Sequence, residues 1–322
     1  MGVRLERGAV HGWDGWWIRR GPLALGLTPA VGGRIMSMRW RDDELGFVHP
    51  DHAGRVVDVG AVADVTALKR DLGFVHWGGD KTWLAPQERW RDAIPFLDLD
   101  GGAYAIAVEI DDGSTVRIRM TSPACREVGV RLTRTVTVSD HDEEWLVEHA
   151  LENVGVDPVA WGLWDVQQLR GPGIAWVPRR TEGSAFPDGV KAYPAEGDSE
   201  AARAEVVRVV GDVARIDCRR PRWFKFGVDA EEGWALGVLE TPDARLVAHR
   251  KCVDVVAGAT YAHGSVVEVY NCPDHLYFEL EVHGPVVTLR PGERTTLVER
   301  RRTWEIDVAP ETRDAVRTLA TR

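Results

Sequence analysis

Short segments that alternate apolar and polar residues, each followed by a turn, run through most of this chain of 322 residues. Residues 115–120 read Thr-Val-Arg-Ile-Arg-Met, and residues 144–151 end at the turn Glu-Asn-Val-Gly. A period of two predicts half-buried strands, and frequent turns predict antiparallel sheets packed as a sandwich. We therefore expect an all-β fold. Further strands are expected at 128–138, 158–168, 206–210, 214–218, 225–229, 234–239, 246–249, 265–271, 277–283 and 295–306.

Helix is expected in few places. Residues 310–320 predict a helix, because Pro310 suits a first turn and Ala315, Val316 and Leu319 share one face. Residues 62–70 predict a short turn of helix, and residues 195–203 are either a short helix or a surface loop. No composition break marks a linker, so we expect a single domain over residues 1–322.

Charge and composition exclude several classes of protein. The net charge of −10 argues against a general nucleic-acid binder, which needs a basic face. No apolar run approaches 20 residues, and charged residues interrupt the first 20 positions, so neither a membrane span nor a signal peptide is expected. The four cysteines lack a metal-binding spacing, which is typical of a reducing, cytoplasmic compartment. The sequence carries no signal of the oligomeric state.

Tryptophan is unusually frequent, with 14 Trp against 7 Phe and 5 Tyr. Indole has an apolar face and a polar edge, so it suits both a large core and a cleft that stacks sugar rings. Most of these residues are expected in the core, and some are expected to face a ligand.

The segment 74–87 combines charge, aromatic rings and a Gly-Gly pair in an expected loop. It contains His76, Asp80, Lys81 and Trp83. Loops on a rigid sheet are where binding residues concentrate, and paired glycines permit close approach of a ligand. The alternative is a structural turn with a solvated lysine.

A second candidate segment is the strand 276–285. Alternation places Tyr277, Glu279, Glu281 and His283 on one face. Two carboxyl groups, a phenol and an imidazole in a row suit acid–base chemistry, and a nearby carboxylate raises a carboxyl pKa toward neutrality. The alternative is a strand face exposed to solvent.

Two further segments carry candidate ligand contacts. In residues 161–170, Asp165 and Gln167 share a face and Trp164 lies on the other. In residues 222–227, Lys225 lies between aromatic residues, either as a surface side chain or as a ligand contact.

Several catalytic motifs are absent from the sequence. There is no Gly-x-Ser-x-Gly elbow, P-loop, His-Glu-x-x-His motif or dinucleotide fingerprint. The histidines show no metal-ligand spacing, so no metal site is expected.

Four segments resemble the aldose 1-epimerase, or galactose mutarotase-like, superfamily. Residues 27–38 (Leu-Thr-Pro-Ala-Val-Gly-Gly-Arg-Ile-Met-Ser-Met) are similar to its opening hairpin, and residues 75–79 to its Leu-His-Gly-Gly segment. Residues 286–297 contain Leu-Arg-Pro-Gly-Glu, which resembles its closing turn before a long final strand. The run Gly-Gly-Asp-Lys-Thr-Trp-Leu-Ala-Pro-Gln at 78–87 looks most like an uncharacterised bacterial branch. These segments occur in the right order over most of the chain.

The resemblance implies an antiparallel β-supersandwich that holds a sugar in a concave cleft. It implies that Glu281 is the base, or Glu279 if the register slips by two, and that His76 binds the sugar. The family's acid histidine falls on Trp164, whose indole is no acid at neutral pH. Asp165 and Lys225 are the candidate replacements.

We therefore expect an isomerase of aldose 1-epimerase type that needs no cofactor and acts on a sugar or sugar derivative. Glu281, Glu279 and Asp165 are the expected catalytic residues. The expected substrate-binding residues are His76, Asp80, Lys81, Trp83, Gln167, Lys225, Tyr277 and His283. The alternatives are a carbohydrate-binding protein without turnover, and a lyase or glycoside-processing enzyme on the same fold.

Overall fold

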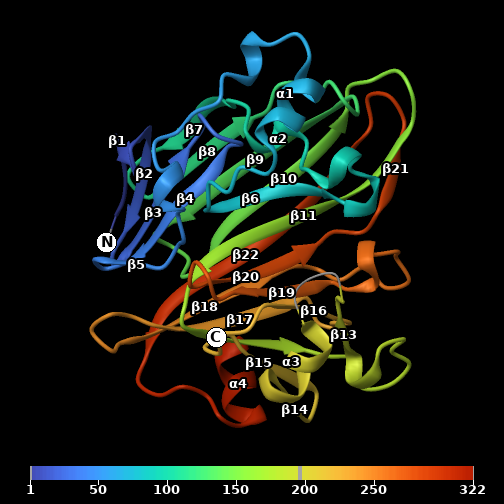
Figure 1. The fold of residues 1–322 in the computed structure, drawn as a ribbon. Helices are drawn as coiled ribbons and strands as arrows, with labels where there is room; N and C mark the ends of the chain where they lie inside the picture. Colours follow the sequence, from blue (N-terminus) through green and yellow to red (C-terminus); the bar gives the residue numbers. More distant parts are fainter. Residues whose placement is uncertain (1, 195–197, 322) are drawn as a thin grey trace.

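Two large antiparallel sheets dominate the computed structural model, which describes residues 2–194 and 198–321 (Figure 1). In the twelve-stranded sheet, β5 (Asp43–Glu44) pairs with β4 and β21 (Val287–Leu289) pairs with β11. The main order of this sheet is β1 (Val3–Val10), β2 (Trp13–Arg20), β3 (Leu23–Thr28), β4 (Arg34–Trp40), β6 (Asp80–Ala85), β11 (Val159–Arg170), β20 (Tyr277–His283), β19 (Val267–Cys272), β16 (Phe224–Val228) and β13 (Val190–Ala192).

The second sheet has ten strands and includes the long strand β22 near the end of the chain. Its order is β14 (Val207–Val210), β15 (Val213–Asp217), β12 (Gly173–Pro178), β17 (Trp234–Glu240), β18 (Leu246–Cys252), β22 (Arg294–Ile306), β10 (Trp145–Asn153), β9 (Val130–Ser139), β8 (Thr115–Thr121) and β7 (Ala105–Asp111). The predicted all-β sandwich is confirmed, and the predicted strand 277–283 has the same bounds as β20.

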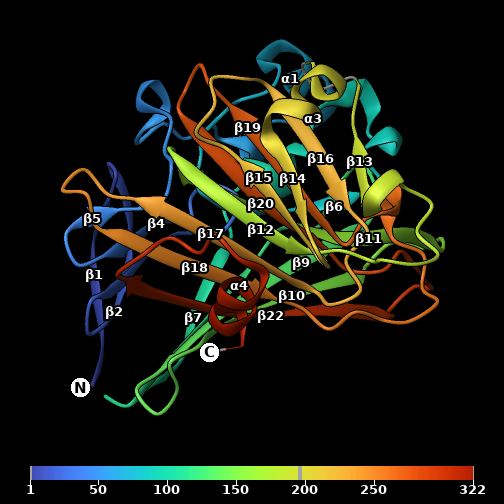
Figure 2. The same cartoon turned by 90° about the horizontal axis from the view of Figure 1, so that it is seen from below.

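The α-helices are short and lie outside the two sheets. They are α1 (Val65–Leu72), α2 (Leu97–Asp100), α3 (Ser199–Val206) and α4 (Arg313–Ala320). Figure 2 shows α4 beside β17, β18 and β22 of the ten-stranded sheet. Val316 and Ala320 of α4 pack there against Trp304 and other apolar residues of that sheet. No helix among the described residues is long and apolar enough to cross a bilayer.

Two predicted helices, and a third segment expected as either a helix or a surface loop, correspond to helices in the structure, with shifted ends. The helix expected at 310–320 begins at Arg313, because the side chain of Thr312 caps it by accepting from Ala315 N. The turn expected at 62–70 is α1, which Asp64 caps through Ala67 N. The segment expected at 195–203 lies partly in α3, and its first three residues, 195–197, lie outside the described part of the chain.

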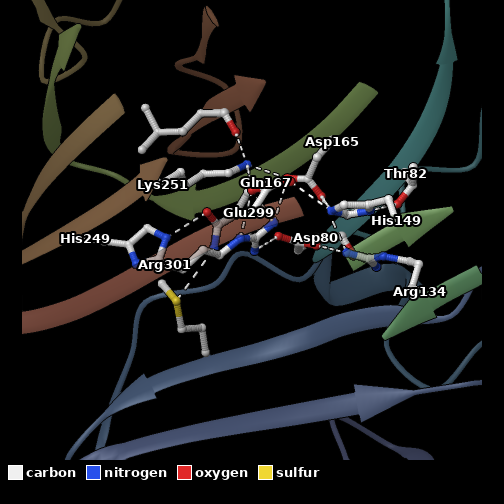
Figure 3. Close-up of polar contacts among 12 residues, drawn as sticks. Asp80, Thr82, Arg134, His149, Asp165, Gln167, His249, Lys251, Glu299 and Arg301 are labelled. Atoms are coloured by element: carbon white, nitrogen blue, oxygen red, sulfur yellow. Dashed lines mark hydrogen bonds and ion pairs between the residues drawn. The ribbon is translucent and has the colours of Figure 1, made fainter. Parts of the chain in front are cut away.

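A layer of ion pairs joins the two sheets within the apolar core (Figure 3). Asp80 of β6 and Asp165 of β11 reach from the twelve-stranded sheet. Asp80 pairs with Arg134 and Arg301, and Asp165 pairs with Lys251 and with Arg301 Nη2 at 2.9 Å. Each of these side chains is at most 3% exposed. Buried charges are tolerated only when they are paired, so this layer restricts how the sheets pack together.

Glu299 of β22 completes the formal charge balance of the layer. It accepts from Arg301 Nε at 2.9 Å and is hydrogen-bonded to His149 Nε2 at 2.8 Å. Burial opposes ionisation of Glu299, but Arg301 and Lys251 outweigh it and lower the pKa of Glu299 to about 2. Burial and Glu299 likewise oppose ionisation of Asp165, and the neighbouring cations still lower its pKa. Three carboxylates thus face three cations inside the sandwich.

Candidate functional site

The strands β11 and β20 are buried on both faces, and each face has its own set of polar residues. The antiparallel register places Trp164 opposite His283, Val166 opposite Glu281, and Gln168 opposite Glu279. Since side chains alternate along a strand, these residues share one face. Asp165 and Gln167 project from the other face, toward the ten-stranded sheet, where Gln167 Oε1 is 2.9 Å from His249 Nε2.

A cavity of about 240 Å³ opens on the face of the twelve-stranded sheet away from the ion-pair layer. Its wall joins the centre of this sheet to the loop between β6 and α2. The lining residues are Phe74, Trp83, Gln87, Trp90, Ala93, Pro95, Trp164, Gln168, Lys225, Tyr270, Tyr277 and Glu279. A second lobe of about 340 Å³ shares Gln87, Ala93 and Lys225 and continues to Tyr193, Pro194 and His263. Lys225 therefore lies where the two lobes meet.

Aromatic rings form one wall of the cavity. Trp83 meets Trp90 edge-on at 5.3 Å and Trp164 edge-on at 5.2 Å. Trp164 is 1% exposed and stacks on His283 at 5.2 Å. These contacts fix the indoles, and fixed aromatic faces suit a flat, partly apolar ligand.

Glu279 is the carboxyl group that lines the cavity. Its Oε1 accepts from Gln168 Nε2 at 2.7 Å and lies 3.5 Å from Lys81 Nζ. Gln168 Oε1 in turn lies 3.0 Å from His76 Nε2. The amide of Gln168 therefore positions Glu279 and His76 at once.

Lys225 of β16 connects the cavity to two buried carboxyl groups. Its Nζ lies 3.0 Å from Glu268 Oε2 and 3.0 Å from Glu281 Oε2, and 4.7 Å from the centre of the Trp164 ring. Burial opposes the charge of Lys225, but Glu268 and Glu281 outweigh it and raise its pKa. Lys225 is thus a protonated, cavity-lining donor.

Glu281 lies behind Lys225 and Trp164 and has no exposed surface. Its Oε2 also accepts from Trp164 Nε1 at 2.8 Å. Burial raises the pKa of Glu281 to about 8, because Lys225 only partly offsets the burial and the nearby Glu279 and Glu268. Glu281 therefore holds a proton at neutral pH.

Glu268 has a different environment, although Lys225 also contacts it. Its Oε1 accepts from Tyr193 OH at 2.7 Å and from Ser265 Oγ at 2.9 Å, and lies 3.0 Å from His263 Nδ1. Burial opposes its ionisation, but Lys225 and His283 outweigh burial and lower its pKa well below the usual range. Glu268 is an ionised anchor for Lys225.

Lys81 and His76 complete the wall behind Glu279. Burial lowers the pKa of Lys81, although Glu279 opposes this shift. Burial and the nearby Lys81 lower the pKa of His76 to about 3, so its imidazole is neutral. Lys81 Nζ also lies 4.5 Å from the centre of the Trp83 ring.

Most of the residues selected from the sequence lie together around this cavity. Trp83, Lys225, Tyr277 and Glu279 line it, and His76, Lys81, Glu281 and His283 lie behind these residues. The structure corrects the placement of Asp80, Asp165 and Gln167, which belong to the layer between the sheets. Asp165 therefore cannot serve as the acid in the cavity, because β11 itself separates it from the ligand space.

The Gly78-Gly79 pair also has a structural rather than a ligand-binding explanation. Gly78 has φ of 96°, and a Cβ there would lie 2.5 Å from Phe47 O. A Cβ at Gly79 would lie 2.9 Å from Met36 Sδ. The glycines let the chain pass close to its own backbone before β6 begins.

Sequence reasoning missed several residues of the site. Gln168 follows Gln167 in β11, and Glu268 of β19 is paired with Glu281 of β20. Both residues lie in strands where polar and apolar residues alternate, so this pattern could have indicated them. Tyr193 comes from a loop and His263 from a single 3-10 turn (Ala262–Gly264), for which the sequence carries no such signal.

Comparison of the structure with solved structures identifies the fold. A candidate mutarotase from Salmonella typhimurium has a TM-score of 0.59 at 10% identity, covering 94% of both chains. A galactose mutarotase-like protein from Clostridium acetobutylicum has a TM-score of 0.56 at 8% identity, covering 95% of this chain and 99% of that one. A galactose mutarotase-like protein from Lactobacillus casei has a TM-score of 0.53 at 12% identity, covering 89% and 99%.

Neither a family model nor a curated protein matches the sequence significantly. The structural likeness alone therefore shows that this chain has the galactose mutarotase-like fold, as the sequence resemblance predicted.

Proposed function

We propose that this protein acts on the anomeric centre of a sugar, as an enzyme of aldose 1-epimerase type. The observation that carries the proposal is the pair Glu279 and Lys225, an acceptor and a protonated donor that line one aromatic-walled cavity. The structural neighbours, one named as a candidate mutarotase and two as galactose mutarotase-like proteins, support the same class of chemistry.

Ring opening of a cyclic sugar needs two proton transfers and no cofactor. Glu279 takes the proton from the anomeric hydroxyl, and Lys225 gives a proton to the ring oxygen. The bond between the anomeric carbon and the ring oxygen breaks, and the anomeric carbon becomes an aldehyde. Rotation of the aldehyde and reversal of both transfers close the ring with the opposite configuration and restore both residues.

Glu279, rather than Glu281, is proposed as the residue that contacts the substrate, because Glu279 lines the cavity. Glu281 acts as a positioning residue and a proton reservoir. It holds the ammonium of Lys225 at 3.0 Å, and its pKa of about 8 keeps a proton next to that donor.

Lys225 is also the proposed replacement for the family's acid histidine, which the resemblance aligns with Trp164. The ammonium lies over the Trp164 ring at 4.7 Å and has both Glu268 and Glu281 behind it. A cation over an indole face is stabilised by the ring, so the tryptophan helps to hold the donor.

The test follows the interconversion of a freshly dissolved single anomer by polarimetry or NMR, over a panel of aldoses. The wild-type protein should accelerate the interconversion of at least one sugar. Glu279→Gln should lower kcat by about 100-fold or more, which is the usual contribution of a general base. The proposal fails if no sugar is interconverted faster than in buffer, or if Glu279→Gln is as active as the wild type.

A second candidate is a carbohydrate-binding protein without turnover. The observation that favours it is that Lys225 is held between two buried carboxyl groups and that an indole stands where the family has its acid histidine. Equal sugar affinity of wild type and Glu279→Gln in calorimetry, with no acceleration by either protein, would select this function.

A lyase or glycoside-processing enzyme would reveal itself by a new reducing end or an unsaturated product. Burial raises the pKa of both Tyr193 and Tyr277, so both phenols stay protonated at neutral pH and neither is available as a base. The site therefore favours anomeric proton transfer over a tyrosine-dependent elimination.

A further inference from the structure

Three histidines from distant segments meet at the edge of the cavity. His49 precedes the short helix Pro50–His52, His76 precedes β6, and His275 lies in the turn between β19 and β20. One ligand nitrogen from each of the three lies within 4.8 Å of the others. We infer that His49, His76 and His275 form a binding site for a divalent transition metal of the zinc class.

The chemistry of the donors favours zinc over calcium or magnesium. Imidazole nitrogen is a preferred ligand of Zn²⁺, whereas Ca²⁺ and Mg²⁺ prefer oxygen. Three protein ligands are typical of zinc sites that keep one position open for water or a ligand oxygen. The Zn–N distance is about 2.1 Å, so three ligand nitrogens around one ion must approach more closely than 4.8 Å.

The surroundings permit this approach. His275 is exposed in a turn, so its side chain has room to rotate. Its ring lies 4.7 Å from that of His49 and 5.7 Å from that of His76. Binding through His49 Nδ1 would displace the long contact of 3.3 Å from Asp51 N, and binding through Nε2 would leave that contact in place.

The hydrogen bonds of His76 match those of a metal ligand. Its Nε2 lies 3.0 Å from Gln168 Oε1, an acceptor, so the hydrogen is on Nε2 and the lone pair is on Nδ1. Metal-binding histidines commonly donate their second ring N–H to an oxygen, which fixes the tautomer. Gln168 thus orients His76 for a metal.

Aromatic rings form the floor beneath the three imidazoles. Phe47 lies 5.4 Å from His76 and 6.4 Å from each of His49 and His275, measured between ring centres. Phe47 itself is buried and stacks on Tyr277 at 4.7 Å. An apolar floor limits the access of water to a metal and strengthens its bonds to the ligands.

None of the three ligands takes part in the proposed proton transfers, although Gln168 links His76 to Glu279. The position of the site beside Gln168 and Tyr277 would bring the open position of the metal to the edge of the cavity. An oxygen of a cavity ligand is the donor that this position would accept.

The test measures metal binding by the full chain. Protein treated with a chelator and then titrated with ZnCl₂ should bind one equivalent in calorimetry, and CoCl₂ should give the visible absorption bands of tetrahedral Co²⁺. His49→Ala and His275→Ala should each weaken zinc binding by roughly 100-fold, since even an outer partner such as Gln168 is worth about 10- to 100-fold. Circular dichroism should show that both variants are folded.

The matched control is His141→Ala, because the His141 side chain is 78% exposed and distant from the three histidines in the sequence. This variant should bind zinc like the wild type. The inference is overturned if the wild type binds no zinc, or if His49→Ala and His275→Ala bind it with unchanged affinity. Loss of binding only in His263→Ala would also overturn it, since it would place the metal beside Glu268 and His283 instead.

Discussion

The indole of Trp164 donates a hydrogen bond of 2.8 Å to Glu281 Oε2, and neither side chain is more than 1% exposed. Trp164, whose indole is no acid at neutral pH, therefore stabilises the protonated carboxyl group of Glu281. This contact couples the aromatic wall of the cavity to the proton reservoir behind Lys225.

Trp164→Phe should destabilise the protein by more than its lost volume explains. It removes one of the two donors to the buried Oε2 of Glu281, and a hydrogen bond of this kind is worth about 0.5–1.5 kcal/mol. Urea unfolding gives the change in the free energy of unfolding. Trp176→Phe is the matched control, because Trp176 is fully buried and its Nε1 has no partner in the described part of the chain. Equal losses in both variants would contradict the role of the hydrogen bond.

Gln168→Leu should lower kcat for anomer interconversion while the fold is retained. The amide of Gln168 holds Glu279 at 2.7 Å, and a hydrogen bond to a charged group is worth about 1.5–3 kcal/mol, or roughly 10- to 150-fold in rate. Gln87→Leu, which changes the rim shared by both lobes, should affect mainly KM. A change in KM alone for Gln168→Leu would show that the amide binds the sugar rather than positions the base.

Glu281→Gln should make the protein progressively more stable than the wild type as the pH rises from about 4.5 to 8. The folded state keeps a proton on Glu281 up to about pH 8, whereas the unfolded chain releases it near 4.5. The folded state thus binds more protons in this window, so the contribution of Glu281 to stability falls with pH by up to about 1.4 kcal/mol per unit. Urea unfolding of both proteins at pH 5 and pH 8 measures the difference, and a constant difference would refute the raised pKa.

Asp165→Asn should unfold far more easily than the wild type. It leaves the buried cations Arg134, Lys251 and Arg301 facing only Asp80 and Glu299, so one positive charge in the core is no longer balanced. Breaking a buried pair in this way costs about 3–5 kcal/mol. Glu6→Gln removes half of the exposed pair with Arg19 and should cost less than about 1 kcal/mol. A loss for Asp165→Asn as small as that for Glu6→Gln would show that the layer between the sheets contributes little.

Much of the fold could be predicted because the period of two is strong along the chain. The strand β20 and its face with Tyr277, Glu279, Glu281 and His283 were predicted correctly, and all four residues are buried. Which face of β11 and of β6 lines the cavity could not be predicted in the same way. Both faces of these strands are largely buried, so alternation separates Asp165 from Trp164 without telling which one meets a ligand.

The histidine cluster shows a second limit of sequence reasoning. His49, His76 and His275 are far apart in the chain, and only the pairing of β19 with β20 and the passage of the chain beside Phe47 bring them together. Spacing rules detect metal ligands on one helix or one turn, so they carry no signal for a site built from three segments.

The strict alternation along β11 has a consequence for how this protein could change over evolutionary time. Trp164 and Gln168 touch the cavity, while Asp165 and Gln167, their immediate neighbours, hold the two sheets together. Substitutions at one set leave the contacts of the other in place. A new ligand preference could therefore arise, in nature or in the laboratory, within a largely buried strand of the molecule without disturbing the scaffold that carries it.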